Sequence, residues 1–371
     1  ALPLSFVRKN SVDLSLQNIE SLKKQKPMEA HCSPTGVIVI VASWNLSLRV
    51  ILDRLVPALL AGNAVIVKVS SESVITTHIL SEIILLSGAP KGLVNVIVSQ
   101  DIEVKKLLIS HPGVAAISFV GSLATALRLL PLINQSSLQN FKKIQISSGS
   151  KNSAVFLEDP NDEKFKHVMD SFLIGQGQLV WNSSRLFILE KFERQWEERI
   201  KNYLASLRPS EGLEDSSIWT PCLKKDSFYQ FGEIRKMASD DQAQLLQASY
   251  SLTESQKNFF LPPLFTKDMS RCSTLQQDQI HAPFFILSTV KYPFDVVKFS
   301  NVSYYGFAAH IWGDQVKLSK LTDGLDVGMV CYNKSSVEVA GAFSAVKQSG
   351  FGLQDFQSFG TFFSNVKKVT E

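Results

Sequence analysis

Short apolar runs alternate with amphipathic stretches along the first part of the chain. Runs rich in Val and Ile, typical of buried parallel strands, occupy residues 37–42, 64–69, 93–98 and 115–120. Stretches with helical spacing of apolar residues lie between them, at residues 48–61, 73–87 and 101–110. Short turns separate the elements, as at Gly62-Asn63. This order predicts an α/β fold built on a doubly wound parallel sheet.

The rest of the chain continues the pattern less regularly. It predicts strands at 143–146, 153–157 and 327–333, helices at 162–176 and 190–206, and a strand-like end at 359–369. Residues 207–275 are the least regular, and we expect the most mobile loops there. Near the N-terminus, apolar residues within 11–25 predict a helix that ends before Pro27.

The composition is that of a folded protein with a substantial core. The chain has 371 residues, of which 45% are hydrophobic, and this length is enough for two domains. The net charge is +4 and the basic residues are scattered, so a nucleic-acid-binding surface is not indicated. No apolar run reaches the ~18–20 residues of a membrane span. Because Ala1 rather than Met opens the chain, we expect a segment of a longer polypeptide.

Cysteine usage bears on the compartment and on metal binding. The four cysteines, Cys32, Cys222, Cys272 and Cys331, are far apart and form no Cys-x-x-Cys pair. Such spacing favours neither a zinc site nor a disulfide framework, so we expect no metal and a reducing compartment. The cytoplasm is the first expectation, and the mitochondrial matrix fits the same observation.

Six short segments, taken in order, carry a resemblance to one family. They are Ser43-Trp44-Asn45-Leu46, the run from Pro57 to Lys68, Phe119-Val120-Gly121-Ser122, Ser147-Ser148-Gly149-Ser150-Lys151, Gly177-Gln178-Leu179-Val180 followed by Arg185, and Val346-Lys347-Gln348-Ser349-Gly350-Phe351-Gly352. They resemble the P-W-N-x-P, P-A-L-x-x-G-N-x-V-V-x-K, F-T-G-S, E-L-G-G-K, G-Q-x-C and V-K-x-S-G-x-G motifs of the aldehyde dehydrogenase superfamily. The chain is similar to that family over roughly residues 30–370.

The resemblance implies a domain plan. Residues 1–35 form an N-terminal helix and lead-in shorter than the family's, and residues 36–148 a Rossmann-like dinucleotide-binding domain. Residues 149–352 form a catalytic-type α/β domain, and residues 353–371 a strand of the kind that pairs across subunits in the family. We therefore expect a homo- or hetero-oligomer, with an active aldehyde dehydrogenase as one candidate partner.

The two positions that carry the family's chemistry have changed. In the family, a cysteine thiolate attacks the aldehyde carbonyl, and a glutamate is the general base that hydrolyses the thioester. Val180 stands at the cysteine position and Ser147 at the glutamate position. Valine has no nucleophilic atom, and a serine hydroxyl is not a base at neutral pH. We therefore predict an inactive member of the family, in which Val180 fills apolar volume.

Other side chains near these positions have more than one interpretation. In the family, the amide at the position of Asn45 donates to the oxyanion, whereas an asparagine after a strand also turns the chain locally. Ser183 and Ser184 are candidates for a substitute nucleophile, but no histidine or lysine lies near them in sequence. Cys331 falls in a predicted core strand, where we expect a buried, inert thiol.

The resemblance also places a cofactor. Lys68 stands where a family lysine contacts the adenosine ribose, and Ser71 stands where an acidic residue would hold the ribose hydroxyls. Glu72 lies one position further along. Without a carboxylate at position 71, the site would not repel the 2′-phosphate of NADP, so NADP would also be tolerated. Gly121-Ser122 suits either a pyrophosphate or a helix N-cap.

The remaining cofactor positions are weaker. Ala42, Ser43 and Trp44 stand on the cofactor side of Asn45 by resemblance. Gln279 replaces a glutamate that binds the nicotinamide ribose in the family, and an amide binds a hydroxyl less strongly than a carboxylate does. Binding of NAD or NADP is therefore expected to be weak or lost.

Three functions remain open from the residues and the resemblance. The first is an inactive aldehyde-dehydrogenase-like protein with a structural, scaffolding or regulatory role, and the loss of both catalytic groups favours it. The second is an NAD(P)-dependent oxidoreductase acting on aldehydes with a non-standard nucleophile. The third is a dinucleotide-binding sensor, because a fold by itself does not define an activity.

Overall fold

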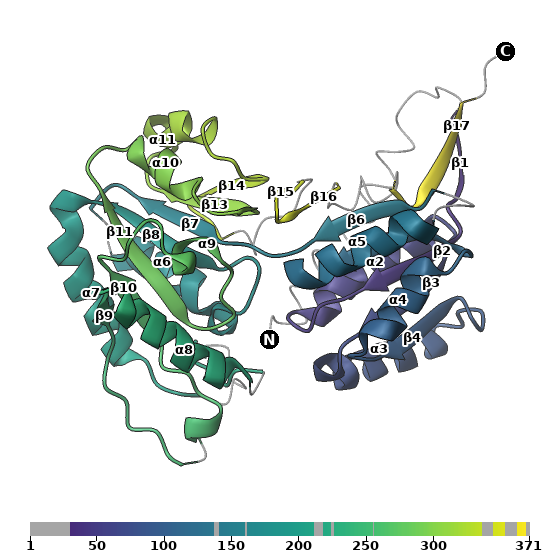
Figure 1. Ribbon diagram of the computed structural model, residues 1–371, viewed down its shortest axis with the longest axis horizontal. Coiled ribbons are helices and arrows are strands. Elements are labelled where there is room, and N and C mark those ends of the chain that lie inside the picture. The colour runs from purple at the N-terminus through teal and green to yellow at the C-terminus, as the bar shows by residue number, and fades with distance from the viewer. Residues whose placement is uncertain are drawn as a thin grey trace. The chain divides into compact units, whose positions relative to one another are not determined.

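The protein folds into two compact units, each built on its own sheet. A computed structural model describes residues 30–136, 141–159, 162–210, 218–223, 226–254, 256–335, 344–352 and 362–368 (Figure 1). The six-stranded unit comprises the described residues within 30–148, 344, 350–352 and 362–368, and the seven-stranded unit those within 149–335 and 345–349. The helix predicted at 11–25 lies outside the described residues.

The six-stranded unit alternates strands and helices in the predicted order. Its sheet has the strand order β16-β6-β5-β2-β3-β4, in which β16 is antiparallel to β6 and the others are parallel. The elements are β2 (Val37–Val41), α2 (Ser47–Leu60), β3 (Ala64–Val69), η1 (Ser71–Ser73), α3 (Val74–Leu86), β4 (Val94–Val98), α4 (Ile102–Ser110), β5 (Val114–Val120), α5 (Leu123–Ser136), β6 (Lys143–Ser147) and β16 (Gly350–Phe351). The predicted α/β fold is confirmed, and the predicted ends from β2 to β6 lie within one residue of those observed.

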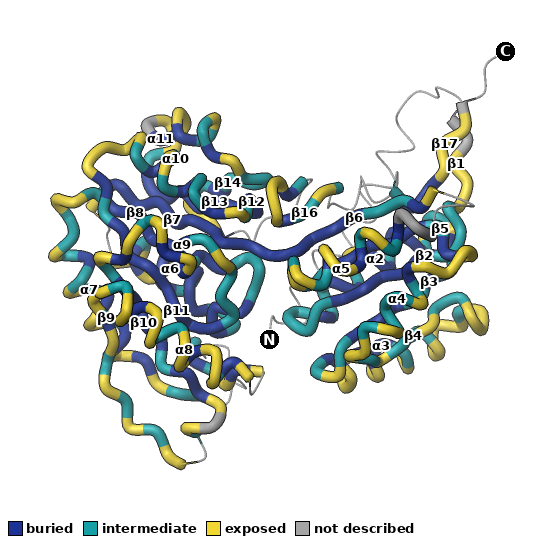
Figure 2. Tube along the Cα trace, viewed as in Figure 1, coloured by how far each residue is buried: buried dark blue, intermediate teal, exposed yellow. Residues whose placement is uncertain are grey.

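Both faces of this sheet are buried. Val39 of β2 and Ile117 of β5 join Ile109 of α4 and Leu129 of α5 in one apolar cluster. Ile38, which points to the opposite face because strand residues alternate, is equally buried. Figure 2 shows the central strands largely buried beneath helices with exposed outer residues, whereas the edge strand β4 has intermediate and exposed residues. This two-sided cover explains why the strands were recognisable as continuous apolar runs.

The turn after α2 joins three separate parts of the six-stranded unit. Gly62 has a φ of 84°, the left-handed conformation that commonly ends a helix. The Asn63 amide donates to the carbonyl of Ala58 at 2.9 Å and to that of Phe363 at 2.8 Å. Its oxygen accepts the N–H of Gly36 at 2.8 Å. One buried amide therefore ties the helix end to the start of β2 and to the C-terminal segment.

A short ribbon stands apart from the main sheet of this unit. It pairs β1 (Ala30–Pro34) with β17 (Ser364–Lys368) in antiparallel register. The predicted C-terminal strand is therefore present in its described part, and it pairs within the chain. Pairing with another subunit stays a prediction.

The seven-stranded unit has the strand order β14-β13-β7-β8-β11-β10-β9, in which β9 is the antiparallel member. Its elements are β7 (Asn152–Phe156), α6 (Asp162–Leu173), η2 (Ile174–Gly177), β8 (Ser183–Leu189), η3 (Glu190–Phe192), α7 (Glu193–Ser206), α8 (Asp226–Asp240), β9 (Gln244–Leu246), η4 (Gln256–Asn258), β10 (Leu264–Lys267), α9 (Thr274–Gln277), β11 (Phe284–Val290), α10 (Asp295–Ser300), β12 (Tyr305–Gly306), β13 (Ala308–Trp312), α11 (Gln315–Thr322), β14 (Met329–Tyr332) and β15 (Val346–Lys347). The short strands β12 and β15 form a separate antiparallel pair.

A long helix of this unit was not predicted. Residues 207–275 were expected to be the least regular, yet 226–240 form the helix α8. Phe231, Ile234 and Ala238 are spaced three and four apart and pack into one apolar cluster. The polar residues around them obscured this narrow apolar stripe in the sequence.

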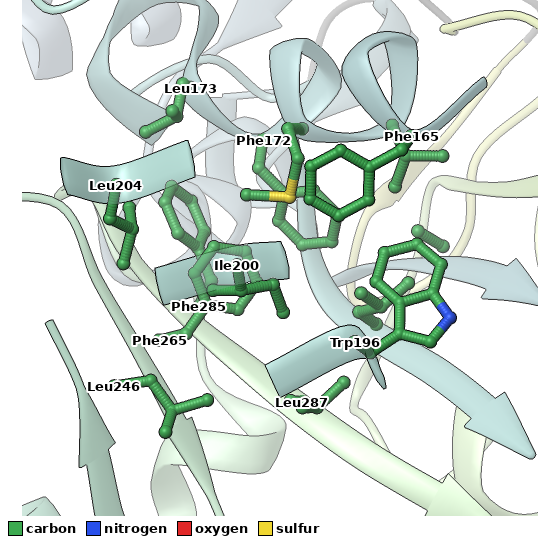
Figure 3. Packing of buried hydrophobic residues seen from close by; sticks show 14 of the residues in the cluster. Phe165, Phe172, Leu173, Trp196, Ile200, Leu204, Leu246, Phe265, Phe285 and Leu287 are labelled. Atoms are coloured by element: carbon green, nitrogen blue, oxygen red, sulfur yellow. The ribbon is translucent and has the colours of Figure 1, made fainter. Parts of the chain in front are cut away.

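Aromatic rings form the centre of the seven-stranded unit (Figure 3). Phe172 of α6 lies with its ring centroid 5.3 Å from that of Phe265 and 5.2 Å from that of Phe285. Trp196 of α7 meets the ring of Phe156 edge-on at 5.3 Å. These side chains come from strands and helices far apart in sequence, so they fix the helices against one face of the sheet.

Candidate functional site

The predicted positions of the six-stranded unit gather at one edge of its sheet. Each follows or ends a parallel strand: Ala42, Ser43, Trp44 and Asn45 after β2, Lys68 and Ser71 at the end of β3, Gly121 and Ser122 after β5, and Ser147 at the end of β6. Because β6, β5, β2 and β3 are neighbours, these carboxyl ends lie side by side. This is the edge at which open α/β sheets bind ligands.

The turn between β2 and α2 is held by local hydrogen bonds. The Ser43 hydroxyl donates to the carbonyl of Asn45 at 3.3 Å, and the N–H of Ala42 donates to that of Lys68 at 2.9 Å. Leu46, with a φ of 49°, then begins α2. Ser43, Trp44 and Asn45 are half-buried. This tight turn accounts structurally for a polar residue at position 45, and its donation to an oxyanion stays a prediction.

A charged cluster surrounds Lys68. Burial, together with nearby Lys105, lowers the pKa of the Lys68 ammonium to about 8, and Glu72 partly opposes this shift. The Glu72 carboxylate accepts hydrogen bonds of 3.5 Å from Ser71 and from Gln100. Glu72 therefore supplies a negative charge near Lys68, although Ser71 occupies the position where the sequence pattern expects it.

Gly121 and Ser122 form the turn between β5 and α5. The N–H of Gly121 donates to the carbonyl of Ser147 at 3.1 Å. A Cβ at Gly121 would lie 2.7 Å from the ring of Phe119, so packing requires glycine here. The Ser122 hydroxyl accepts the N–H of Thr125 at 3.3 Å, which is an N-cap bond. The N-cap interpretation is thus observed, whereas pyrophosphate binding stays a prediction.

Ser147 is buried inside the sheet. Its backbone lies opposite Val120 of β5 on one side and Gly350 of β16 on the other. A Cβ at Gly350 would come within 2.0 Å of the carbonyl oxygen of Ile146. The glycine of the segment resembling V-K-x-S-G-x-G is therefore needed for the close approach of two backbones.

The loop that carries Val180 is shaped by asparagine side chains in the seven-stranded unit. The Asn152 amide donates to the carbonyl of Val180 at 2.8 Å. The Asn182 amide donates to the carbonyls of Phe172 at 3.2 Å and Ile174 at 2.9 Å, and its oxygen accepts the N–H of Leu179 at 2.8 Å. Val180 itself is half-buried. The hydrogen bonds that hold this loop therefore come from Asn152 and Asn182 and involve no side-chain atom of Val180.

Gln279 packs against the start of β7 in the same unit. Gly149 has a φ of 127°, and a Cβ there would lie 2.4 Å from the Gln279 side-chain oxygen. Two residues further, the His281 ring lies 3.3 Å from the carbonyl oxygen of Gln178. The structure thus brings the segments of Val180 and Gln279 together. Both belong to the seven-stranded unit, whereas Asn45 belongs to the six-stranded unit.

Lys151 is a buried ammonium whose Nζ has no hydrogen-bond partner among the described residues. Burial, together with the charge of Arg185, lowers its pKa to about 7, and Asp278 partly opposes this shift. Arg185 is also buried, and its guanidinium donates to the carbonyl of Lys151 at 2.7 Å and to that of Ser300 at 3.0 Å. Both cations belong to the sequence motifs, but the motifs did not indicate that Lys151 and Arg185 are buried next to each other.

Ser183 and His310 form a pair that sequence reasoning missed. The Ser183 hydroxyl lies 2.7 Å from Nδ1 of His310, and both residues are fully buried. Burial lowers the pKa of His310 to about 4, so the ring is neutral at pH 7. No histidine is near Ser183 in sequence, yet one contacts it in space. The two residues lie 127 positions apart, and no local pattern signals such a contact.

Two further observations concern metals and membranes. Within the described residues, no group of three or more His, Cys, Asp or Glu side chains is arranged to hold a metal ion. Over the same part of the chain, no helix is both long and apolar enough to cross a membrane. Cys331 in β14 is buried, as its predicted core strand implied.

The fold and the residues at the sheet edge together indicate a class of protein. A doubly wound unit with polar side chains at its carboxyl edge, joined to a second α/β unit, is an architecture found among NAD(P)-dependent oxidoreductases. The sequence model described as "Aldehyde dehydrogenase family" matches residues 4–369. The chain therefore belongs to the aldehyde dehydrogenase family, as its motifs suggested.

Individual relatives support the same assignment. The chain is 30% identical over 359 residues to 2-aminomuconic semialdehyde dehydrogenase of Homo sapiens, covering 91% of this chain and 70% of that protein. It is 24% identical over 354 residues to a chloroplastic aminoaldehyde dehydrogenase of Arabidopsis thaliana, covering 95% and 68%. A crystal structure of Mycobacterium tuberculosis aldehyde dehydrogenase complexed with NAD+ matches with a TM-score of 0.85 and 21% identity, over 91% of this chain and 69% of that one.

We expect Lys151→Met to stabilise the protein, and more so at pH 6 than at pH 10. The folded-state pKa of about 7 lies below the ordinary value of 10.5, so the unfolded chain binds the proton more readily between these values. Wild-type stability therefore rises with pH across that window, and the variant lacks this dependence. The free energy of unfolding in urea at pH 6 should increase by up to about 5 kcal/mol.

Lys142→Met is the matched control, because the Lys142 ammonium already donates to the carbonyl of Ile109 at 2.9 Å. Removing that satisfied bond should not stabilise the protein. Equal effects of the two substitutions, or a loss of stability in Lys151→Met at pH 6, would show that the Lys151 ammonium has a partner in solution.

We expect His310 to make the fold sensitive to acid. Its folded-state pKa of about 4 lies below the ordinary value of 6.5, so its contribution is complete above pH 6.5 and is lost as the pH falls toward 4. Between pH 7 and pH 4.5, the free energy of unfolding of the wild-type protein should fall by about 2–3 kcal/mol because of His310. In urea unfolding, the His310→Gln variant should not show this decrease in the free energy of unfolding. The control His111→Gln, at an exposed residue, should show the same decrease as the wild type. Identical pH profiles for wild type and His310→Gln would contradict the assignment.

Proposed function

We propose that this chain is a catalytically inactive member of the aldehyde dehydrogenase family, with a structural, scaffolding or regulatory role. Val180 carries the proposal, because it occupies the position of the thiol that attacks the aldehyde carbonyl. A branched alkyl group can form no covalent intermediate. Ser147, at the position of the general base, offers no carboxylate to activate water.

The residues that maintain the backbone geometry near these two positions indicate that the function of the chain depends on its folded structure. Amide side chains of Asn152 and Asn182 hold the loop of Val180. The close glycine approaches at Gly149 and Gly350 are kept as well. Residues that serve backbone geometry thus persist where residues that serve covalent chemistry do not. This combination suits a protein whose function depends on its surface or on binding.

A non-standard nucleophile is the alternative, and burial weighs against it. Ser183 lies beside His310, which is the pairing that activates a serine in many hydrolases, but both residues are fully buried. Cys331 is also buried. An aldehyde dissolved in water reaches neither group without a large opening of the core.

Dinucleotide binding is a second candidate function, and the Lys68 cluster favours it. The Lys68 ammonium and the Glu72 carboxylate interact at the end of β3. A neighbouring cation and carboxylate fit the hydroxyls of an adenosine ribose. Gly121-Ser122 would face the pyrophosphate at the start of α5. NAD or NADP bound there supplies a hydride acceptor, and without a thiol the chain would act as a sensor.

Assembly and location are part of the proposal. We infer that the chain forms oligomers through the ribbon of β1 and β17, with itself or with an active aldehyde dehydrogenase, since exposed strand edges favour such pairing. The scattered free cysteines suit a reducing compartment, with the cytoplasm as the first choice.

The proposal predicts that purified protein has no aldehyde dehydrogenase activity with either NAD or NADP. Turnover is measured as NADH or NADPH formation with a panel of aliphatic, aromatic and amino aldehydes. Val180→Cys combined with Ser147→Glu restores the thiol and the carboxylate and should introduce measurable turnover. Val180→Ala with Ser147→Glu is the control that lacks a thiol. Wild-type turnover that disappears in Ser183→Ala or Cys331→Ala would overturn the proposal.

Dinucleotide binding predicts a separate result. Saturating NAD or NADP, at ~100 times its Kd, should add about 2.7 kcal/mol to the free energy of unfolding. Lys68→Met should abolish that gain, whereas Lys91→Met, at an exposed lysine after α3, should leave it unchanged. An absence of stabilisation by both cofactors would eliminate the sensor function and leave the structural role.

A further inference from the structure

The carboxyl edge of the seven-stranded sheet contains a pocket of about 90 Å³. β8, β11 and β10 are parallel neighbours, so their carboxyl ends meet at this edge (Figure 1). The loop of Val180 precedes β8 and therefore lies at the opposite, amino edge of the sheet. The polar residues that line the pocket end or follow the three strands, and they are Glu193, Lys267, Asp268, Arg271, Ser288 and Thr289.

The connections that follow β8 and β11 diverge at this edge. After β8 the chain forms α7, whose Trp196 packs in one cluster with Leu186 on one face of the sheet, and it continues to β9. After β11 it forms α10, whose Val296 packs with Phe187 on the other face, and it continues to β13. β9 and β13 lie on opposite sides of the β8-β11 pair. Open α/β sheets bind ligands at such a divergence between adjacent parallel strands.

Arg271 gives the pocket a positive charge that no carboxylate of the described residues neutralises directly. Its Nη2 donates to the carbonyl of Thr289 at 2.8 Å, and its guanidinium carbon lies 4.3 Å from the centroid of the Phe299 ring. Its Nη1 is buried and has no hydrogen-bond partner in the described part of the chain. Burial lowers the pKa of Arg271, and no described carboxylate opposes this shift. The guanidinium is therefore held in place and still has N–H groups to donate.

Asp268 gives the same pocket a carboxylate that is only loosely paired. The Lys267 ammonium lies 2.9 Å from a carboxylate oxygen of Glu197 and 3.2 Å from one of Glu193. The distance from this ammonium to the Asp268 carboxylate is 3.9 Å, which is too long for a hydrogen bond. Lys267 therefore pairs mainly with the two glutamates, and the Asp268 carboxylate can accept hydrogen bonds from a ligand.

The charges around the pocket restrict the kind of ligand that fits. A simple anion would pair with Arg271 but would be repelled by Asp268 and Glu193, and a simple cation would meet the opposite conflict. A molecule that carries both a carboxylate and an ammonium satisfies both charges. The volume of the pocket corresponds to a few water molecules, so such a ligand has few heavy atoms. The hydroxyls of Ser288 and Thr289, which line the same space, can donate to one end or accept from the other.

We propose that this pocket binds a small amino acid in its zwitterionic form, with the carboxylate on Arg271 and the ammonium on Asp268. Binding is non-covalent and takes place at the edge of the sheet away from Val180, so it does not depend on whether the chain is catalytic. A ligand held by both residues connects the segment after β10 to the end of β11. It therefore stabilises the seven-stranded unit against unfolding.

Isothermal titration calorimetry of the full chain tests the charge requirement. The probes are glycine, β-alanine and γ-aminobutyrate, in which increasing lengths of chain separate the two charges. At least one of them should bind, with one site per chain. Acetate and methylammonium, each of which carries only one of the charges, should bind at least tenfold more weakly, a difference of about 1.4 kcal/mol.

Two substitutions assign the two ends of the ligand. Arg271→Met removes the positive charge and should raise the Kd of the bound amino acid at least tenfold, without weakening the binding of methylammonium. Asp268→Asn should raise the Kd of the amino acid by a similar factor, without weakening the binding of acetate. The matched controls Arg194→Met and Asp240→Asn, at exposed residues of the same unit, should leave the Kd unchanged.

Thermal unfolding without ligand checks that each variant folds. The side chain of Asp268 is 64% exposed, so Asp268→Asn tests the pocket even where Arg271→Met does not fold.

Three results contradict this assignment. One is the absence of binding by all three amino acids. Another is binding of acetate as tight as that of the amino acids, because the pocket would then be an anion site in which Asp268 has no role. The third is amino-acid binding that Asp268→Asn leaves unchanged, because the ligand would then occupy a different place on the chain.

Discussion

Parallel strands must be covered on both faces, and most of this structure follows from that constraint. In the six-stranded unit, α4 and α5 bury one face while residues such as Ile38 are buried on the other. In the seven-stranded unit, the ring cluster around Phe172 and Trp196 covers one face of its sheet. The carboxyl edge of the first sheet is consequently where polar side chains collect. The outer side of α3 departs from this order, because Ile75, Ile79 and Ile83 are exposed there.

The same constraint explains which features were predictable. The central strands β2, β3 and β5 are largely apolar on both faces, so they appear in the sequence as continuous apolar runs and their ends could be predicted closely. α8 was missed because a narrow stripe of Phe231, Ile234 and Ala238 lies among polar residues. Periodicity detects a buried element well when both of its sides are apolar, and poorly when a single thin stripe is buried.

The features of the candidate site also fall into those that the sequence predicts and those that only the folded structure shows. Val180, Ser147 and Gln279 could be named from motif order, since a motif fixes which residue occupies which position. The contacts of Lys151 with Arg185 and of Ser183 with His310 could not, because they join residues that only the folded chain brings together. Ser122 illustrates a third case. The sequence allowed a cap or a ligand contact, and the observed N-cap bond satisfies the first without deciding the second.

Lys151 is a buried group that titrates near neutral pH, in the interior of the protein and not at its surface. Its pKa of about 7 means that near neutrality some folded molecules carry a buried ammonium and the others a buried amine. The positive charge of Arg185 next to it favours the amine. The core is therefore a mixture of two protonation states under physiological conditions. A modest change of pH, or an anion brought near this region, redistributes the population between these two states.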